Sequence, residues 1–284
     1  MIRRPPRSTQ SRSSAASDVY KRQDIYRPGH ADLSYDEKYG IRDYRGGGRS
    51  SNRETVGRVA AGAIAKKLLK AMKIKTFGFV QQIGNIKCEK ININYIEKNS
   101  LRIADKDKFD EMANLIDSVR KSGDSIGGVI EVRSTGMPAG LGSPVFEKLD
   151  ARLSSAIMGI GGVRGFEIGL GFQVASMKGS EVNDIMVGKS KGKVKFRTNN
   201  AGGILGGISN GNDLILRFAL KPTSSISQKQ DSIDNKGKQK KLQVKGRHDP
   251  CLCPRAVPIA EAMVNLVLLD CILENNLSTV KKIT

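Results

Sequence analysis

The chain has 284 residues, of which 38% are hydrophobic and 27% are charged, and its formal net charge at pH 7 is +20. This hydrophobic content is enough to bury one large core or two modest ones, which excludes a wholly disordered protein. A charge of this size favours an anionic partner, and composition alone leaves nucleic acid, anionic lipid and phosphorylated small molecules open.

Cysteine usage and hydropathy narrow the cellular setting. The four cysteines at positions 88, 251, 253 and 271 have neither disulfide-framework nor zinc-site spacing, which predicts a cytoplasmic protein without a metal site. The most apolar stretch, residues 259–273, is interrupted by Glu261, Asn265 and Asp270. We therefore expect no membrane span and no membrane partner.

The first 23 residues resemble the translation of a sequencing adapter. They contain no continuous apolar region like that of a secretory signal, and no clear amphipathic periodicity like that of a transit peptide. We expect residues 1–23 to be a non-native segment and residues 24–284 to form one partial domain. The rest of the chain remains strongly basic without them.

The glycine-rich run at residues 45–51 predicts an anion socket. Three consecutive glycines allow positive φ and close approach of the backbone to a ligand. Ser51 and Glu54 have capping-box spacing, which predicts a helix that begins near Ser51 and turns its N–H groups towards the socket. Helical spacing continues through the apolar residues Val56, Val59, Ala60, Ala63, Ile64 and Leu68. The alternative is a flexible Arg/Gly segment of the kind found in RNA-binding tails.

Five further elements follow from apolar periodicity and breakers up to residue 175. We predict a strand at 76–86 and a helix at 105–121, followed by a strand at 127–133. Ser143 and Pro144 predict the start of a helix that buries Val145, Phe146, Leu149, Leu153 and Ile157 and ends at the glycines of 159–162. A strand bent at Gly169 and Gly171 should then occupy 163–175.

The remainder predicts a strand at 214–220, a long mobile loop at 224–247 and a closing helix at 259–273 entered through Pro258. The apolar face expected for that helix consists of Ile259, Met263, Leu266, Val267 and Cys271. No fixed-period repeat and no clear domain boundary is visible.

Both histidines of the chain lie in polar, turn-like sequence. His30 lies in Arg-Pro-Gly-His-Ala-Asp (27–32) and His248 in Gly-Arg-His-Asp-Pro-Cys (246–251). Binding residues concentrate in such turns, although a plain surface histidine would look the same. Residues 221–225 add one lysine and three hydroxyls at a strand end, which predicts a second anion cradle. The glycine turns at 159–162 and 202–207 lack the context of a dinucleotide fingerprint.

Taken together, these blocks closely resemble the chorismate synthase family. The resemblance runs over residues 24–284 and is carried by 27–32, 38–51, 53–55, 58–67, 123–127, 138–142, 201–209, 221–225 and 246–251. It implies an α+β fold, a β-α-β sandwich with helices between antiparallel sheets, assembled as a homotetramer. The family's beginning, with a Ser-His motif and two arginines, has no counterpart here, so we expect an incomplete fold.

The resemblance implies a lyase that converts 5-enolpyruvylshikimate 3-phosphate to chorismate and phosphate, using reduced FMN without net oxidation. A substrate with one phosphate and two carboxylates explains a basic chain without nucleic acid. The family's FMN contacts correspond to Arg49, Ser50, Ser51, Gly161, Gly162, Gly206, Lys221, Pro222, Thr223, Ser224, Ser225 and Arg247. Its substrate contacts correspond to Arg27, Ser51, Arg53, Arg247 and Asp249.

Catalytic roles are likewise implied by the family. His30 would stabilise the anionic reduced flavin, and Asp249 with Ser51 would help to move a proton at flavin N5. The histidine that protonates the leaving phosphate would belong to the absent beginning, so we expect the 284-residue chain to lack turnover. The resemblance leaves open whether a separate reductase or an intrinsic NADP-linked activity supplies reduced flavin. The alternative function is a basic nucleic-acid-binding protein, disfavoured by 5% aromatic content and the absence of Trp.

Overall fold

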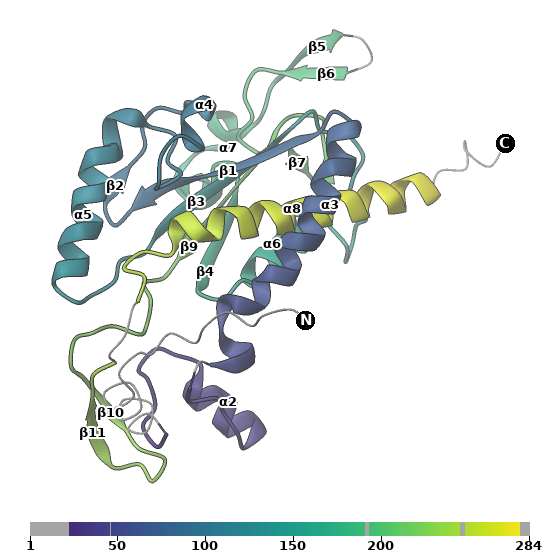
Figure 1. Ribbon diagram of the computed structural model, residues 1–284. Helices are drawn as coiled ribbons and strands as arrows, with labels where there is room; N and C mark the ends of the chain where they lie inside the picture. Colours follow the sequence, from purple (N-terminus) through teal and green to yellow (C-terminus); the bar gives the residue numbers. More distant parts are fainter. Residues whose placement is uncertain (1–22, 46, 191–192, 245–247, 279–284) are drawn as a thin grey trace, which may run out of the picture. The chain divides into compact units, whose positions relative to one another are not determined.

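The computed structural model describes residues 23–45, 47–190, 193–244 and 248–278 (Figure 1). The adapter-like segment, up to residue 22, lies outside the described residues. The chain folds into two compact units. Unit 1 comprises the described part of Met1–Ser51 with Asp117–Ser125 and Thr223–Pro250; unit 2 comprises Asn52–Ile116, Ile126–Pro222 and the described part of Cys251–Thr284.

Unit 2 is built on a five-stranded sheet in which every neighbouring pair is antiparallel. The strand order is β2 (Ile86–Lys87), β1 (Lys75–Ile83), β3 (Gly128–Thr135), β9 (Leu214–Leu220) and β4 (Val163–Ile168). Because β3 and β4 both run antiparallel to β9, they are parallel to each other, and the chain between them contains α6 (Leu149–Met158). The α+β class and the antiparallel sheets expected from the sequence are confirmed.

Three helices of unit 2 form its helical layer. Helix α8 (Cys253–Leu277) packs on β1 and β3, and α6 packs on β4 and on α8. Helix α3 (Thr55–Ala71) packs against α8 (Figure 1). The core between these elements contains fully buried side chains at Ile130, Leu153, Leu216, Phe218, Val257 and Leu268.

The contact between α3 and α8 reverses the predicted face of α3. A Cβ placed on Gly62 would lie 2.3 Å from the Cβ of Ala262, so the two helices meet where the side chains are smallest. Such close packing turns the large apolar residues outwards: Val56 and Ile64 are 73% and 67% exposed. The buried residues of α3 are Thr55, Gly62, Ala65 and Leu69.

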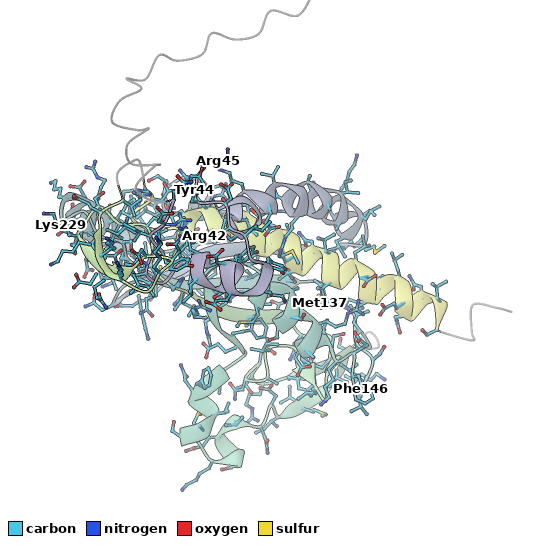
Figure 2. The ribbon with its side chains drawn as sticks, turned by 90° about the horizontal axis from the view of Figure 1, so that it is seen from below. Arg42, Tyr44, Arg45, Met137, Phe146 and Lys229 are labelled. Atoms are coloured by element: carbon cyan, nitrogen blue, oxygen red, sulfur yellow. The ribbon has the colours of Figure 1, made fainter. Side chains whose placement is uncertain are left out.

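Helix starts differ from prediction at two places. An α-helix does not begin near Ser51: the 3-10 turns η1 (Gly48–Ser50) and η2 (Asn52–Glu54) precede α3, and Ser51 itself is extended. The predicted capping box at α3 is therefore wrong. Ser143 and Glu147 exchange two backbone hydrogen bonds of 2.9 Å, which delays α6 until Leu149. As a result Phe146, labelled in Figure 2, is 90% exposed instead of buried.

Two predicted strands are shorter than expected. The segment 76–86 turns at Gly84, where φ is +56°, and is divided between β1 and β2. The segment 163–175 forms β4 only to Ile168 and continues as the 3-10 helix η4 (Gly171–Ser176). In both cases glycines with positive φ end the strand, at Gly84 and at Gly169 and Gly171.

The closing helix is longer than predicted, because it begins at Cys253 and carries Pro258 in its interior. The predicted apolar face is confirmed in part, because Cys271 is buried and Ile259, Met263 and Val267 are partly buried against the core. The buried surface of the helix is wider than predicted and includes Val257, Ala260 and Leu268. By length and composition α8 could cross a membrane, but half of its apolar window is buried in the protein, as in an ordinary core helix.

Apart from α5, whose first part belongs to unit 2, the remaining elements of this unit are short. They are α4 (Ile93–Ile96), η3 (Lys106–Lys108), α5 (Phe109–Lys121), α7 (Gly179–Val182), β5 (Met186–Ser190), β6 (Lys193–Phe196), β7 (Ile204–Leu205) and β8 (Ile208–Ser209). The last turn of α5 is assigned to unit 1.

Unit 1 contains α2 (Asp32–Tyr39), η1 and a hairpin of β10 (Gln230–Ile233) and β11 (Gln239–Leu242). This hairpin corrects the mobile loop predicted for 224–247. Asp234 organises its turn, because one carboxylate oxygen accepts the backbone N–H groups of Lys236 at 3.0 Å and Lys238 at 2.9 Å. Gly237 completes the turn at φ +75°.

Candidate functional site

A buried carboxylate, Asp32, organises the polar cluster of unit 1. Its side chain is 2% exposed and accepts two hydrogen bonds from the Arg27 guanidinium, from Nε at 2.7 Å and from Nη2 at 2.8 Å. Arg42 Nη1 lies 3.3 Å from the same carboxylate, and the Arg42 guanidinium also stacks on Tyr26. Two arginines are thereby fixed in place by one acid.

The pKa of Asp32 lies well below its ordinary value. Burial by itself raises that pKa, but the hydrogen bonds from Arg27 and His30 and the charges of both residues outweigh burial and lower it. Asp32 is consequently ionised at neutral pH, and its negative charge is the anchor for the surrounding cations.

His30 is the third partner of Asp32. Its Nδ1 lies 2.9 Å from Asp32 Oδ1, so the carboxylate orients the ring through Nδ1 and leaves Nε2 as the atom that can meet a ligand. Gly47 adopts φ +85°, and a Cβ there would lie 3.6 Å from His30 Cε1 and 3.0 Å from Ser50 Oγ. The glycine loop thus passes directly beside the histidine.

Segments far apart in the sequence meet His30 within unit 1. The hydroxyl of Ser224 donates to the carbonyl of Gly29 at 2.7 Å, and the hydroxyl of Thr223 donates to the carbonyl of Asp249 at 2.8 Å. The structure therefore connects the 27–32, 223–225 and 248–249 segments that the sequence analysis singled out. Ser50 lies on the other side of Gly47 from His30, and a cavity of about 420 Å³ is lined in part by Arg27 and His30.

Unit 2 contains a second group of the expected residues at the glycine turn after α6. A Cβ on Gly161 would lie 2.1 Å from Asn52 Oδ1, and Asn52 Nδ2 donates to the Gly161 carbonyl at 3.3 Å. Gly162 has φ +93°, and its carbonyl accepts the backbone N–H of Lys221 at 2.9 Å. Arg53 lies next to Asn52 in η2 and is exposed.

Like charges meet at this turn. Burial lowers the pKa of Lys221, and the positive charge of Arg164 lowers it further. Two cations that repel each other beside a left-handed glycine suit an anion, which would relieve the repulsion.

One expected residue lies apart from this turn. Gly206 occupies the β7–β8 turn, next to Gly207, whose carbonyl accepts the Leu149 N–H at the start of α6. Gly161 and Gly162 follow the other end of that helix, which at ten residues is about 15 Å long. Within the described chain, Gly206 is therefore not brought together with Gly161 and Gly162.

Some expected residues are only partly described. Arg247 lies outside the described residues, and for Arg49 the backbone alone is described. Ser51 and Ser225 are half-buried in unit 1, and Pro222 ends its segment of unit 2. Among the residues placed by the structure, no three His, Cys, Asp or Glu side chains are grouped to hold a metal ion.

Sequence reasoning assigned no role to four residues that the structure places in these groups. Asp32 and Arg42 lie inside the quoted motifs, and a lone acid among arginines was the signal that could have identified Asp32. Asn52 and Arg164 carry no local signal: Asn52 is recognised only through its hydrogen bond to Gly161, and Arg164 only through the effect of its charge on Lys221.

Comparison with known proteins agrees with these motifs. The family model described as "Chorismate synthase" matches residues 9–273. A chorismate synthase of Archaeoglobus fulgidus is 52% identical over 258 residues, covering 89% of this chain and 71% of the relative. One of Lachnospira eligens is 48% identical over 267 residues, covering 93% and 73% respectively.

A solved structure titled "Crystal Structure of Chorismate Synthase" shares the fold, with a TM-score of 0.72 and 34% sequence identity. The similarity covers 86% of this chain and 70% of that structure. Since the family match covers most of the sequence and relatives near 50% identity align over almost all of it, the chain belongs to the chorismate synthase family.

Proposed function

We propose that this lyase of the shikimate pathway uses reduced FMN as its cofactor and 5-enolpyruvylshikimate 3-phosphate as its substrate, with the Asp32 cluster holding part of the site. The observation that carries the proposal is the left-handed glycine backbone at Gly47 beside a histidine fixed by a buried carboxylate. The residues around it are mainly donors, which fits anionic ligands.

The shape of the Gly47 loop supports a flat ligand near His30. A Cβ at position 47 would lie only 3.0 Å from Ser50 Oγ and would fill the space beside the histidine ring, which glycine at φ +85° leaves open. Ser50 N–H and Oγ both bond the Gly47 carbonyl, at 2.7 and 2.5 Å, which holds the loop in this shape. The loop is thus a rigid cradle.

The charges support a phosphorylated ligand in both units. In unit 1, Asp32 occupies Nε and Nη2 of Arg27, so the Nη1 edge of the guanidinium is the edge that can meet an anion. In unit 2, Lys221 and Arg164 provide a second pair of cations beside Gly162. Fixed cations stabilise negative charge that develops on a departing phosphate.

Reduced FMN, when bound, would supply electron density for loss of phosphate and a proton without net oxidation of the substrate. His30 would orient the ligand through Nε2, because Asp32 fixes its other nitrogen. Asp249 would help to move a proton at flavin N5, from a segment positioned by the hydrogen bond that Thr223 donates to the Asp249 carbonyl. Ser51 follows the cradle in extended conformation and is the proposed partner of Asp249.

Two glycines of unit 1 provide a matched test of the cradle. Gly47 and Gly40 both have positive φ, at +85° and +69°, but a Cβ at Gly40 meets nothing within 4 Å. We expect Gly47→Ala to weaken binding of reduced FMN at least tenfold under anaerobic titration, and Gly40→Ala to change it less than twofold. Equal weakening by both substitutions would show that backbone strain, and not the cradle, controls binding.

Substrate binding is tested separately by calorimetry with 5-enolpyruvylshikimate 3-phosphate. We expect Arg53→Gln to weaken binding at least tenfold because a charge-assisted contact to the substrate is lost. Arg197→Gln is the control, since Arg197 is an exposed residue of unit 2 and lies outside the family motif blocks. The substrate assignment of Arg53 fails if the two variants bind alike.

A further inference from the structure

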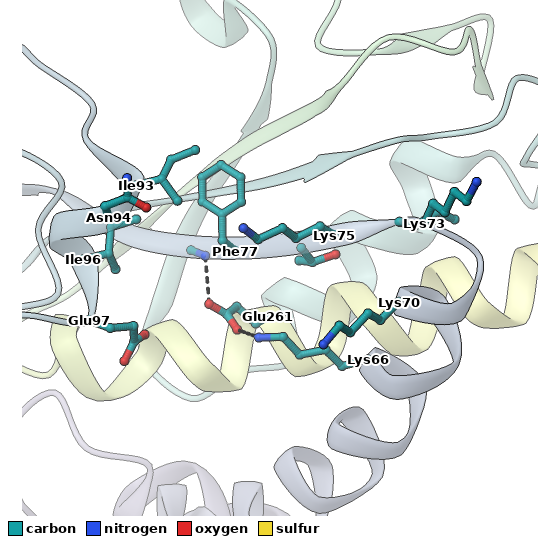
Figure 3. A pocket seen from close by; sticks show the side chains of 13 residues that line it. Lys66, Lys70, Lys73, Lys75, Phe77, Ile93, Asn94, Ile96, Glu97 and Glu261 are labelled. Carbon is teal, nitrogen blue, oxygen red and sulfur yellow. Dashed lines mark hydrogen bonds and ion pairs between the residues drawn. The ribbon is translucent and has the colours of Figure 1, made fainter.

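A cavity of unit 2 that none of the assigned site residues lines is unusually basic (Figure 3). It has a volume of about 470 Å³, within the range of roughly 300–1,000 Å³ typical of small-molecule sites. The end of α3, the start of β1, α4 and one residue of α8 form its walls. Four lysines line it: Lys66, Lys70, Lys73 and Lys75.

Helical spacing puts two of these lysines on one side of α3, since Lys66 and Lys70 are four residues apart. Lys73 follows the end of the helix and lines the same cavity. Lys75 opens β1 and lines the same cavity from the sheet. The charge therefore comes from two different elements.

Most of this positive charge is not neutralised by neighbouring acids. Lys66 donates to Glu261 Oε2 at 2.7 Å, and the other oxygen of Glu261 accepts the Gly78 N–H at 2.9 Å (Figure 3). The second acid of the cavity, Glu97, pairs with Arg102 at 3.2 Å. In the part of the chain that the structure describes, no carboxylate lies within 4.0 Å of the ammonium groups of Lys70, Lys73 and Lys75.

Apolar side chains form the other end of the cavity. Phe77, Ile93 and Ile96 gather opposite Lys70 and Lys73 in Figure 3. Phe77 packs against the small buried cluster of Phe79, Ile96 and Ala104, which fixes its position. Ile93 remains 43% exposed. A flat apolar surface of this kind suits a ring.

The backbone of Lys73 is strained. It has φ +65°, a left-handed conformation that is unfavourable for a residue other than glycine. Glycine is the usual residue at this position after a helix. The negative end of the α3 dipole favours cations at Lys70 and Lys73, but it does not account for Lys75 on the strand.

We propose that this cavity binds a planar organic dianion, with its ring on Phe77 and Ile93 and its negative groups on Lys70, Lys73 and Lys75. In Figure 3, Phe77 and Ile93 lie towards one end of the cavity, Lys70 and Lys73 towards the other, and Lys75 next to Phe77, which suits a molecule with an apolar ring and more than one negative group. A ligand with the charge but without the ring would lose the contact with Phe77, and a neutral ring would lose the ammonium contacts.

The test is calorimetry on the full 284-residue chain with 2,6-naphthalenedicarboxylate as the probe. Adipate carries the two carboxylates without the ring, and naphthalene-2-carboxamide carries the ring without charge. We expect the dicarboxylate to bind with one-to-one stoichiometry and at least tenfold more tightly than either comparison compound. Equal affinity for adipate or for the carboxamide would overturn the proposal.

Substitutions in the cavity test whether the probe binds there. The triple variant Lys70→Gln, Lys73→Asn and Lys75→Gln should bind the probe at least tenfold more weakly. Phe77→Leu should lower the affinity for the dicarboxylate severalfold and leave the affinity for adipate unchanged. The matched control substitutes three exposed lysines of unit 2 outside the cavity, Lys67, Lys87 and Lys98, by Gln and should change affinity less than twofold. Gly47→Ala should leave probe affinity unchanged, which separates this cavity from the FMN cradle. Equal losses in the lysine set and its control would contradict a defined site.

Discussion

The Asp32 cluster of unit 1 and the lysine cavity of unit 2 use positive charge in opposite ways. In the cluster, one buried carboxylate fixes Arg27, Arg42 and His30 at distances between 2.7 and 3.3 Å. In the cavity, Lys70, Lys73 and Lys75 have no described carboxylate within ion-pair distance. The first arrangement orders its cations before any ligand arrives, whereas the second leaves them to be ordered by the ligand.

Side-chain chemistry explains this difference. Arginine has a planar fork of donors that a carboxylate can hold in one orientation, and such pairs remain useful when buried. Lysine carries a compact charge on a flexible stem and is usually solvated. Changes in the cluster should therefore alter folding stability strongly, whereas changes in the cavity should alter ligand affinity more than stability.

The largest effect is expected for Asp32→Asn. It leaves Arg27 and Arg42 buried without their counter-charge, which should lower the free energy of unfolding by about 3–5 kcal/mol in urea titrations. Asp231→Asn is the control, because the Asp231 side chain is 77% exposed and its one described ion pair is with Lys241, which is equally exposed. A loss below about 1 kcal/mol for Asp32→Asn would remove the contrast between the two regions.

Gly62→Ala tests the support of the lysine cavity. The added methyl would clash with Ala262 and force α3 away from α8, costing about 1–3 kcal/mol and disturbing the Lys66–Glu261 pair. Gly57→Ala on the same helix meets nothing within 4 Å and should be neutral or stabilising. Circular dichroism in urea measures both variants, and equal stability would show that the helix contact is adaptable.

Lowering the pH should reduce the stability contributed by the Asp32 cluster before it affects the lysine cavity. Because the folded pKa of Asp32 is lowered, its contribution to stability is fully present above the unfolded value of about 4 and is lost as pH decreases from there. For one proton the slope approaches about 1.4 kcal/mol per pH unit. Unfolding titrations between pH 5 and pH 2 should show a shallower slope for Asp32→Asn, and parallel curves would contradict the role of this carboxylate.

The smallest expected effect is a gain in stability. Lys73→Gly removes the cost of a left-handed lysine and should raise the free energy of unfolding by about 1 kcal/mol. The same variant should weaken the dicarboxylate probe, so stability and binding would change in opposite senses. Lys67→Gly, within regular helix, should instead lose about 1 kcal/mol. Destabilisation by Lys73→Gly would assign Lys73 a structural role.

The sequence by itself determined the family, the α+β class and several elements. Motif blocks such as 27–32 and 246–251 identify the family because their residue types and spacing are specific. Strands β3 and β9 follow from short segments rich in β-branched and other apolar residues, and their predicted bounds differ from the observed ones by two residues at most. Local patterns suffice wherever local preference and burial agree.

Tertiary structure decided which faces are buried and which charges have partners. The buried side of α3 is set by close packing of Gly62 on Ala262, and two small residues 200 positions apart carry no local signal. The hairpin at 230–242 likewise required pairing that its polar composition did not predict. Asp32 binds its arginines while three lysines of the cavity meet no described acid, because such pairing depends on burial and on distances between segments that the sequence order does not contain.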